Sequence, residues 1–422
     1  MKATIFPGRC QGSIKIPPSK SMAHRAILCA ALSNDTSLIH NVAYSDDITA
    51  TLNAIKTLGA KVEVNGDTLK ITGIKNIFER DKVDIDCIES GSTLRFLIPI
   101  LALSPKPAQL FGQGRLLQRP QQIYEDIFKK QQLTYLNNQE SILIKGPLHS
   151  DTFIIDGSIS SQFISGLLFA LPLLPNDSQI IINEPYESKS YVDLTLKMMR
   201  QFGIKINVDP DKITIGGNQQ YQASEYTIEG DYSQAAFFAV LAAINAPLTL
   251  TGLDLNSLQG DKAIMDILKS FNADITLGTN CYTIGSQHLK PELINLENCP
   301  DLGPILNVLM MYTPGTSKII NAARLRYKES DRIAAMQEEL RKCGVDFKSN
   351  ENSITINGAK AYQSPSSLFS HHDHRIVMSE AIAATLFDTP VTLTDAQCIN
   401  KSYPNFFTDL QKVGIKVVIS DE

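Results

Sequence analysis

The stretch KMMRQFGIKINV, residues 197–208, joins the end of an amphipathic helix to an alternating strand through one glycine. Glycine adopts the left-handed backbone conformation that commonly ends helices, so Gly203 is predicted to be the turn between the two elements. The same pattern occurs five more times, in AIKTLGAKVEV (54–64), DIFKKQQLTYL (126–136), DILKSFNADITL (266–277), ELRKCGVDFKS (339–349) and DLQKVGIKVVI (409–419). The six predicted turn residues are Gly59, Gln132, Gly203, Asn272, Gly344 and Gly414, and neighbours in this series are roughly 70 residues apart. This spacing predicts a chain built of six similar repeats.

A repeat of this length can hold two helices and three or four strands, which predicts an α/β fold. We expect the six repeats to form two domains of three. The stretch IEGDYSQAAFF, residues 228–238, begins the fourth repeat and is the predicted crossing between the domains. A hinge near Ser19 would let the first strand pair with the second group of repeats. The expected domains are therefore residues 20–229, and residues 1–19 together with 230–422.

The composition favours a cytoplasmic protein without nucleic-acid or membrane partners. The chain has 422 residues, 43% of them hydrophobic, and a formal net charge of -5, so its overall charge does not attract nucleic acid or an acidic membrane. Its seven cysteines are scattered without a CxxC pair, which is typical of a reducing compartment. No signal peptide is recognisable, and the longest apolar stretch, residues 163–174, is too short to span a bilayer.

Basic residues stand at predicted helix starts, where they oppose the helix dipole. In PPSKSMAHR, residues 17–25, Ser19 suits a helix N-cap, yet Lys20 and Arg25 fall in the first turns. Similar helix starts or nearby loops contain Gly91, Ser92 and Arg95; Arg115 and Arg119; Ser160, Ser161 and Gln162; Lys328 and Arg332 around a cap at Ser330 or Asp331; Arg375 after a cap at Asp373; and Lys401. Each alone is most simply a solvated side chain or an ordinary cap. Together they predict a small ligand with several phosphate or carboxylate groups, because helix N-termini bind anions.

Other ligand classes have little support in the sequence. There is neither a GxxxxGK[ST] loop nor a GxGxxG between a strand and a helix, so ATP and NAD are not indicated. The run HHDH, residues 371–374, has no further residues at metal-ligand spacing, and we predict no metal. Two carboxylates lie near the basic residues, Asp301 in CPDLGP and Glu329 in YKESDR. Each could transfer protons or could simply pair with an arginine.

Nine motifs in order along the chain resemble those of the 5-enolpyruvylshikimate-3-phosphate synthases. They are PPSKSMAHRAILCAAL (17–32), SGSTLR (90–95), RLLQRP (115–120), DGSISSQF (156–163), ESKSYVDLTLKMM (187–199), EGDYSQAAFF (229–238), YKESDR (327–332), DHRIVM (373–378) and CINKSYPNFF (398–407). The resemblance implies the two-domain enolpyruvyl transferase fold, with three βαβαββ-type units in each domain and the active site in the cleft between them. The implied substrates are phosphoenolpyruvate and shikimate 3-phosphate, which are both small polyanions.

The resemblance also implies a role for each matching residue. Lys20, Ser21 and Arg25 would contact both ligands, and Gly91 would lie against phosphoenolpyruvate. The phosphate and carboxylate of phosphoenolpyruvate would be bound by Arg119, Arg332, Arg375 and Lys401. Shikimate 3-phosphate would be bound by Ser160, Ser161, Gln162, Ser188 and Tyr191, with Lys328 and Asp301 close to it.

The implied chemistry is an addition followed by an elimination. Asp301 would accept the proton of the attacking hydroxyl, while Glu329, with Lys20, would lie near the methylene group that gains and then loses a proton. The resemblance implies no metal and no organic cofactor, and we expect a monomer. Two residues depart from the family pattern: Glu89 stands where asparagine is usual before the glycine, and Arg324 stands where asparagine is common ahead of the YKESDR motif.

Two other functions remain as alternatives. A UDP-N-acetylglucosamine enolpyruvyl transferase would have the same architecture, but it usually carries a cysteine or aspartate in the loop that corresponds to GQGRLLQR, residues 112–119, and this loop has neither. A non-catalytic clamp of six repeats around DNA would need basic helix faces, whereas the basic residues here stand at helix starts and in loops. An assay of phosphate release with both substrates separates the three.

Overall fold

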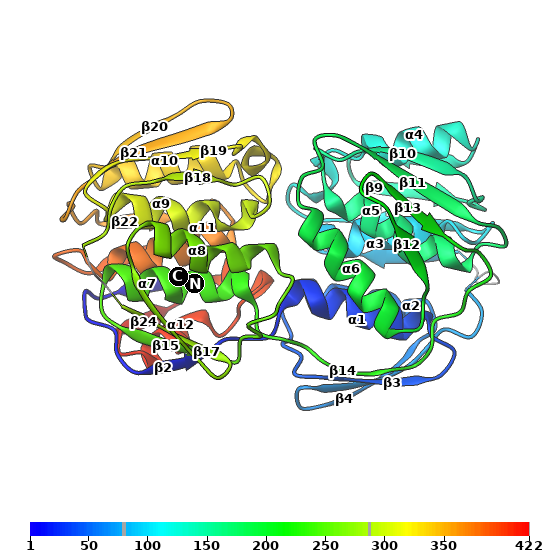
Figure 1. Cartoon of the computed structure of the whole chain (residues 1–422), viewed down its shortest axis with the longest axis horizontal. Helices are drawn as coiled ribbons and strands as arrows, with labels where there is room; N and C mark the ends of the chain where they lie inside the picture. The colour runs from blue at the N-terminus through cyan, green and yellow to red at the C-terminus, as the bar shows by residue number, and fades with distance from the viewer. Residues whose placement is uncertain (78–81, 286–287, 422) are drawn as a thin grey trace. The chain divides into compact units, whose positions relative to one another are not determined.

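The chain divides into two compact units. The computed structural model describes residues 1–77, 82–285 and 288–421, and Figure 1 labels their helices and strands. Unit 1 consists of Met1–Ser19 and Glu229–Glu422, and unit 2 consists of Lys20–Ile228. The chain therefore crosses from one unit to the other twice, directly after Ser19 and directly after Ile228.

The described residues form six four-stranded sheets with one common topology, three in each unit. In one of them, β7 (Pro107–Phe111) pairs in parallel with β6 (Val83–Asp86) and antiparallel with β9 (Ser141–Lys145), which pairs antiparallel with β8 (Thr134–Asn137). The helices α3 (Gly91–Leu101) and α4 (Gln122–Lys130) follow β6 and β7, so the repeat is βαβαββ. The prediction of an α/β fold with six repeats is confirmed.

The remaining strands complete the other five sheets. In unit 2 they are β3 (Thr36–His40), β4 (Lys61–Asn65), β5 (Thr68–Thr72), β10 (Thr152–Asp156), β11 (Ser178–Asn183), β12 (Ile206–Val208), β13 (Lys212–Ile215) and β14 (Glu225–Thr227). In unit 1 they are β1 (Lys2–Ile5), β2 (Ser13–Lys15), β15 (Leu248–Thr251), β16 (Asp274–Gly278), β17 (Cys281–Gly285), β18 (Leu293–Asn295), β19 (Gly315–Ile320), β20 (Asp346–Ser349), β21 (Ser353–Gly358), β22 (Ser367–Phe369), β23 (Val391–Thr394) and β24 (Val417–Ser420).

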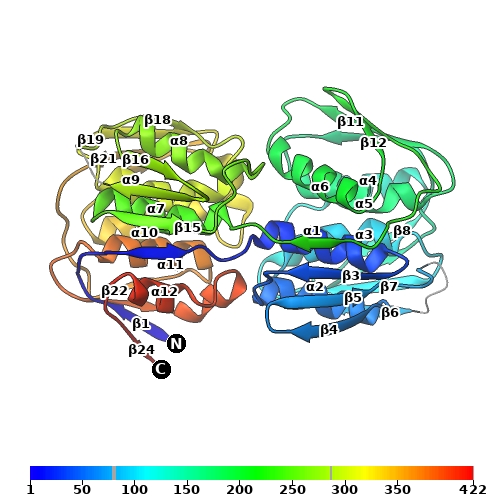
Figure 2. The same ribbon diagram turned by 60° about the horizontal axis from the view of Figure 1, so that its bottom comes forward.

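Two sheets take their first strand from a part of the chain that is distant in sequence from their other strands. The strand β2 comes before the first crossing and pairs in parallel with β15, and β14 comes before the second crossing and pairs in parallel with β3. In a third sheet, β1 lies between β23 and β24, so the two ends of the chain lie side by side, as Figure 2 shows. The order in which the four strands occur along the chain thus differs in these three sheets, but their arrangement within the sheet is the same as in the other three.

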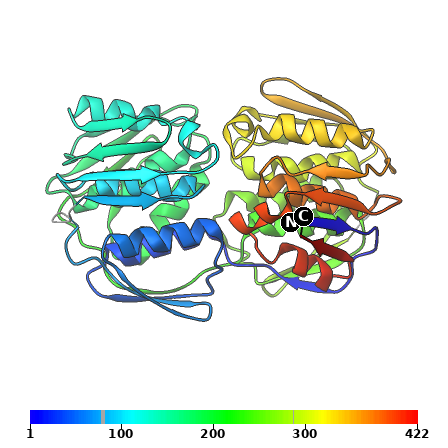
Figure 3. The same cartoon turned by 180° about the vertical axis from the view of Figure 1, so that it is seen from behind.

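Helices buried on nearly all sides form the core of each unit. In unit 1 these are α7 (Tyr232–Ile244), α9 (Gly303–Met311) and α11 (His374–Ala384), which pack against one another and lie between sheets of that unit (Figures 1 and 3). In unit 2 they are α1 (Lys20–Leu32), α3 and α5 (Ser161–Ala170). The other helices keep an exposed face: α2 (Asp46–Thr57), α4, α6 (Lys189–Gln201), α8 (Ala263–Ser270), α10 (Arg332–Lys342) and α12 (Phe406–Lys412).

All six predicted turn residues have a left-handed backbone. Their φ angles are 102° at Gly59, 57° at Gln132, 83° at Gly203, 67° at Asn272, 86° at Gly344 and 94° at Gly414. Each lies between a helix that ends just before it and a strand that begins just after it, as predicted. Gln132 is the strained member of the series, because the left-handed conformation suits glycine and is tolerated by asparagine but is disfavoured for other residues with a Cβ atom.

Replacing Gln132 with glycine is expected to stabilise the protein. The change removes the steric cost of the left-handed conformation and adds chain entropy to the unfolded state, for a net gain of about 0.5–1 kcal/mol in the free energy of unfolding. Urea denaturation measures this gain. Gly344→Ala is the matched control at the same turn of another repeat: its Cβ would meet open space, so a loss of about 1 kcal/mol would come from the backbone alone. A destabilised Gln132→Gly protein would contradict the argument.

Candidate active site

Five helices begin at the positions where the sequence places polar or basic residues. They are α1, α3, α5, α10 and α11, which start at Lys20, Gly91, Ser161, Arg332 and His374. In the last four, backbone N–H groups of the first turn donate to the side chains of Ser90, Ser160, Asp331 and Asp373, respectively. The cap of α10 is thus Asp331, one of the two predicted candidates. These caps fix the backbone on which the predicted site residues stand.

In unit 1, one buried arginine gathers three carboxylates. Arg332 is 1% exposed, and its Nε donates to Asp373 Oδ2 at 2.8 Å. Its Nη1 donates to Asp301 Oδ1 at 3.0 Å, and its Nη2 donates to Glu329 Oε2 at 2.8 Å. Asp301 belongs to the short 3-10 helix η4 (Pro300–Leu302), Asp373 caps α11, and Glu329 precedes α10. The guanidinium therefore holds three separate segments in one place.

Asp301 lies among three basic side chains. Besides Arg332, Lys328 Nζ is 3.1 Å from Asp301 Oδ1, and Arg375 Nη2 is 3.4 Å from Asp301 Oδ2. Arg375 Nη1 also donates to the backbone carbonyl of Asp301 at 3.2 Å. The Asp301 side chain remains 23% exposed, so it can reach a ligand. Lys401 completes the group, with its Nζ 4.0 Å from Glu329 Oε1.

The charges set the protonation states in this group. Burial alone would raise the pKa of the Asp301 carboxyl, but Arg375, Lys328 and Arg332 outweigh it and hold this pKa well below its ordinary value. The pKa of Asp373 is likewise lowered, because Arg332 outweighs the effect of burial. Burial lowers the pKa of the Lys328 ammonium group, although Asp301 opposes the shift. Asp301 is therefore an ionised carboxylate whose charge is shared among three basic side chains.

A fourth acid of unit 1 was missed in the sequence. Asp261 is 1% exposed, belongs to the 3-10 helix η3 (Gly260–Lys262) and accepts a hydrogen bond from the Ser233 hydroxyl. Burial, with the negative charge of Asp301, raises the pKa of Asp261 to about 7, against the opposing charge of Arg375. Nothing in the sequence around Asp261 indicates this, because its neighbours come from distant segments.

In unit 2, Arg25 is a buried link between two helices. Its Nη1 donates to the Ser21 carbonyl at 2.6 Å, and its Nη2 donates to the Tyr191 carbonyl at 3.0 Å. Its Nε donates to Thr195 Oγ1 at 2.8 Å, and its guanidinium lies 5.2 Å from the centre of the Phe96 ring. Burial lowers the pKa of Arg25 to about 10. The group ties the start of α1 to α6, and Thr195 is a partner that the sequence did not reveal.

Lys20 is also paired within unit 2. Its Nζ lies 2.6 Å from Asp47 Oδ2, with the two side chains 18% and 6% exposed. Asp47 is in the first turn of α2, which packs against α1. The positive charge of Lys20 at the start of α1 is thus neutralised by Asp47 at the start of α2. This pairing partly explains, without a ligand, how α1 tolerates a lysine at its positive end.

Gly91 stands beside two predicted ligand contacts. A Cβ atom at Gly91 would lie 3.2 Å from Arg119 Nη1 and 3.4 Å from Gln162 Oε1, so the three residues converge. Arg95 holds them from within α3: its Nη1 donates to Gln162 Oε1 at 2.9 Å, and its Nη2 donates to the carbonyl of Pro120 at 2.9 Å. Arg95 therefore has a positioning role that its place at a helix start did not indicate.

The other predicted residues of unit 2 stand at the starts of α5 and α6, which pack together. Ser160 Oγ accepts from the Gln162 N–H at 3.3 Å, and Ser161 is the first residue of α5. Ser188 precedes α6 with φ 54°, and its carbonyl accepts from the Tyr191 N–H at 3.1 Å. In all, unit 1 brings together Asp301, Lys328, Glu329, Arg332, Arg375 and Lys401, and unit 2 contains Lys20, Ser21, Arg25, Gly91, Arg119, Ser160, Ser161, Gln162, Ser188 and Tyr191.

The two departures from the family pattern have local explanations. Glu89 lies against Gly114 (φ 56°): a Cβ there would overlap the Glu89 carboxylate, so the acid packs on the loop that carries Arg119. Arg324 Nη2 donates to the Glu297 carbonyl at 2.9 Å and so joins two segments of unit 1.

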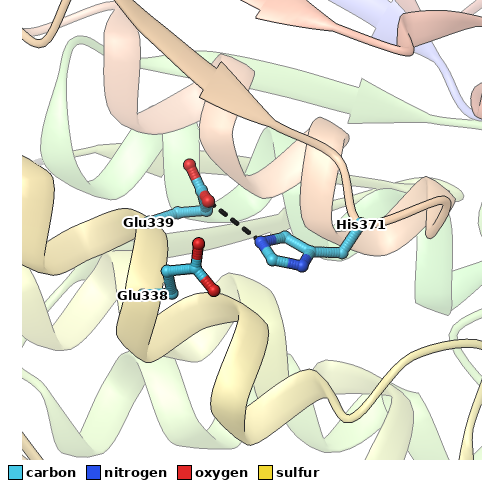
Figure 4. Close-up of side chains that lie close together, drawn as sticks. All are labelled: Glu338, Glu339 and His371. Carbon is cyan, nitrogen blue, oxygen red and sulfur yellow. Dashed lines mark hydrogen bonds and ion pairs between the residues drawn. The ribbon is translucent and has the colours of Figure 1, made fainter.

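The HHDH run contributes to a group outside the basic clusters. Figure 4 shows His371 with Glu338 and Glu339, three residues whose ligand atoms lie within 4.8 Å of one another. Buried Glu339 is already satisfied: its Oε1 is 2.9 Å from His371 Nε2 and 2.6 Å from Lys342 Nζ, and its Oε2 accepts from the Phe369 N–H at 3.0 Å. Burial raises the pKa of Glu339, but His371 and Lys342 outweigh it and the pKa is lowered. We assign no metal to this group.

A family model for EPSP synthase (3-phosphoshikimate 1-carboxyvinyltransferase) matches residues 6–410. The chain belongs to the EPSP synthase family. It is 44% identical over 418 residues to the 3-phosphoshikimate 1-carboxyvinyltransferase of Clostridium botulinum strain Alaska E43, with 97% of this chain and 96% of that one covered. It is also 44% identical over 417 residues to the enzyme of the same name from Clostridium perfringens strain 13, with 98% of each chain covered.

Solved structures agree with this family. EPSP synthase from Acinetobacter baumannii superposes with a TM-score of 0.82 at 25% identity, covering 99% of this chain and 100% of that one. The enolpyruvyl transferase NikO from Streptomyces tendae, at 17% identity and a TM-score of 0.81 over 99% of this chain and 98% of that one, supports the fold alone. The resemblance seen in the motifs is confirmed, and the chain is an enzyme, a transferase of aromatic amino-acid biosynthesis. None of the described helices is long and apolar enough to cross a membrane.

Proposed function

We propose that this enzyme transfers the enolpyruvyl group of phosphoenolpyruvate to the 5-hydroxyl of shikimate 3-phosphate, giving 5-enolpyruvylshikimate 3-phosphate and phosphate. The observation that carries this proposal is the ionised carboxylate of Asp301 among Lys328, Arg332 and Arg375. This group of four side chains combines a base with cations suited to phosphate and carboxylate groups, and the proposed reaction requires both.

The binding roles are divided between the two units. Gly91 and Arg119 of unit 2 and Arg332, Arg375 and Lys401 of unit 1 bind phosphoenolpyruvate. Shikimate 3-phosphate is bound by Ser160, Ser161, Gln162, Ser188, Tyr191 and Lys328, and Lys20, Ser21 and Arg25 serve both ligands. The capped starts of α3 and α5 support this division, because the N-terminal end of a helix favours anions.

The reaction proceeds by addition and elimination. Asp301 takes the proton of the 5-hydroxyl as its oxygen bonds to C2 of phosphoenolpyruvate, while Lys20, with Glu329, protonates C3. The resulting tetrahedral intermediate loses a proton from C3 to the same residues, and the C2–O bond to phosphate breaks. Substrate anions draw Lys328 and Arg375 away from Asp301, which raises the pKa of its carboxyl toward the range a general base needs.

Phosphate release tests the proposal. The purified protein is mixed with phosphoenolpyruvate and either shikimate 3-phosphate or UDP-N-acetylglucosamine, and inorganic phosphate is followed with time. Release only with shikimate 3-phosphate is expected. Release only with the nucleotide sugar would point to the other enolpyruvyl transferase, and no release with either would contradict catalysis.

We also propose that the enzyme is a cytoplasmic monomer that uses neither a metal nor an organic cofactor. The side chains named above supply the acid, the base and the positive charge that the reaction needs. All seven cysteines are free, which suits a reducing compartment. Light scattering after gel filtration measures the oligomeric state.

Changing Gly91 to alanine is expected to weaken inhibition by glyphosate more than substrate binding. The resemblance implies that glyphosate would occupy the proposed phosphoenolpyruvate site, where its greater length would press on this glycine. A Cβ at Gly91 would meet Arg119 Nη1 at 3.2 Å, so the guanidinium must shift by a few tenths of an ångström, and the longer ligand loses more room. The inhibition constant should rise about tenfold or more, and the KM for phosphoenolpyruvate by less. Equal changes in both constants would contradict the placement of Gly91.

A further inference from the structure

One glutamine of unit 1 holds both segments by which the chain crosses between the units. Gln259 is 7% exposed, and its Oε1 accepts from Ser19 Oγ at 3.3 Å and from the Tyr232 N–H at 3.0 Å. Its Nε2 donates to Glu229 Oε1 at 2.7 Å and to the Gly230 carbonyl at 2.8 Å. Both acceptor positions and both donor positions of the amide are therefore used.

The backbone partners determine which way this amide points. The Tyr232 N–H can only donate, so the atom facing it must be the amide oxygen. The Gly230 carbonyl can only accept, so the atom facing it must be the amide nitrogen. A carboxylate at position 259 could not reproduce this pattern, because it has no donor for either Gly230 or Glu229.

The two crossing segments are also bonded to each other. The Ser19 N–H donates to the Glu229 carbonyl at 2.8 Å, and the Asp231 N–H donates to the Pro17 carbonyl at 2.8 Å. Ser257 Oγ donates to Glu229 Oε1 at 2.5 Å and accepts from the Gln259 N–H at 3.1 Å. Residues 17–19 and 229–231 thus form a short ladder, and the loop 257–259 fastens this ladder to unit 1. We name this arrangement the crossing clamp.

The clamp ends one residue before Lys20. The Ser19 backbone and hydroxyl are held in unit 1, while Lys20 Nζ is held in unit 2 by Asp47 at 2.6 Å. The position of the Lys20 backbone therefore depends on the clamp, and the direction of its side chain depends on Asp47.

We propose that Gln259 is a positioning residue for Lys20. The inference rests on the proposed function, in which Lys20 transfers a proton at C3 of phosphoenolpyruvate. Proton transfer is sensitive to small displacements of the acid, so a loosened clamp lowers kcat. The KM for shikimate 3-phosphate should change less than kcat, because most of its proposed contacts lie at the starts of α5 and α6, and only Lys20, Ser21 and Arg25 directly follow the clamp.

Gln259→Glu tests the proposal, and a reciprocal exchange provides the rescue. In wild type the amide of Gln259 donates a hydrogen bond to the Glu229 carboxylate. A glutamate at position 259 replaces this bond with repulsion between two carboxylates, and kcat should fall about ten- to a hundredfold. In Gln259→Glu/Glu229→Gln the amide and the carboxylate change places, so one donor again lies between them. The kcat of this double variant should recover to within about threefold of the wild-type value. The remaining difference comes from the lost hydrogen bond to the Gly230 carbonyl.

Gln219→Glu is the matched control. Gln219 also uses both ends of its amide on backbone groups, accepting from the Lys205 N–H at 2.8 Å and donating to the Gly216 carbonyl at 2.7 Å, but these partners belong to unit 2 and to neither crossing segment. Its change should leave kcat close to wild type. Phosphate release gives kcat and both KM values, and thermal unfolding shows that each variant is folded at the assay temperature.

Three results would overturn the proposal: a Gln259→Glu protein as active as Gln219→Glu, a folded double variant no better than the single one, or a rise in KM for shikimate 3-phosphate without loss of kcat. If Gln259→Glu does not fold, Ser257→Ala removes a smaller part of the clamp and should still lower kcat about threefold or more; an unchanged kcat then overturns it. An inactive wild type, by contrast, would contradict the proposed function itself.

Discussion

Asparagine in place of Asp301 is expected to abolish most turnover while both substrates still bind. Asparagine keeps the shape of the side chain but lacks an oxygen basic enough to take the hydroxyl proton, so kcat should fall by about 10²–10⁴. Lys328, Arg332 and Arg375 keep their charges and lose a competing carboxylate. The affinity for phosphoenolpyruvate should therefore stay the same or increase.

Steady-state phosphate release gives kcat and KM, and calorimetric titration gives the affinity for each substrate. Asp331→Asn is the control, since Asp331 caps α10 in the neighbouring segment and asparagine caps a helix about equally well. Its kcat should stay close to wild type. A kcat for Asp301→Asn within tenfold of wild type would remove Asp301 from the role of base, and a large loss of binding with normal kcat would make it a binding residue instead.

Local sequence signals predicted the repeats, the helix starts and the turns. Glycine and asparagine at five of the six turns have a direct conformational reason, and the spacing of the repeats was needed to place Gln132 among them. The cap at Asp373 and the helix starts at Gly91 and Ser161 could also be read locally, because a capping side chain lies within three residues of the N–H groups that it satisfies.

The partners of the site residues could not be predicted in this way. Asp47 is 27 residues from Lys20, Asp373 is 41 residues from Arg332, and Thr195 is 170 residues from Arg25. Each pair is formed by packing between elements, which one sequence does not encode in any local pattern. The resemblance to a family implied which residues contact the ligands, but it did not indicate these supporting residues.

The structure also changes the meaning of the basic helix starts. Taken from the sequence, Lys20, Arg25 and Arg332 appear as uncompensated cations that need a ligand. In the structure Arg332 and Lys20 already pair with carboxylates, and Arg25 donates to two carbonyls and a hydroxyl. Under the proposed function, an anionic substrate must compete with these internal acceptors, and we expect this competition to link substrate binding to the basicity of Asp301.

Arg332→Met is expected to cause the largest loss of stability. The side chain is 1% exposed, and its removal leaves Asp301, Glu329 and Asp373 close together without their shared cation. Breaking a buried ion pair from one side typically costs about 3–5 kcal/mol in the free energy of unfolding, because the remaining charge stays buried. Urea denaturation measures this loss. Lys70→Met is the control, since Lys70 pairs with Glu63 at 3.2 Å on the surface and should lose only about 0–1 kcal/mol.

A second change and the pH separate lost charge pairing from lost packing. In the double variant Arg332→Met/Asp373→Asn the fully buried carboxylate is replaced by a neutral amide, so the double variant should be more stable than Arg332→Met alone.

In wild type the pKa values of Asp301 and Asp373 are lowered, so their stabilising effect is present above the unfolded-state pKa and is lost as the pH falls through the folded values. Without Arg332 these two pKa values should rise, so the carboxylates take up protons at a higher pH. Acidification then removes the repulsion among the neighbouring carboxylates and stabilises the variant. The gap in stability between wild type and Arg332→Met should therefore narrow as the pH is lowered from 7 toward 4. A gap that stays constant over this range would mean that Arg332 stabilises unit 1 by packing rather than by its charge.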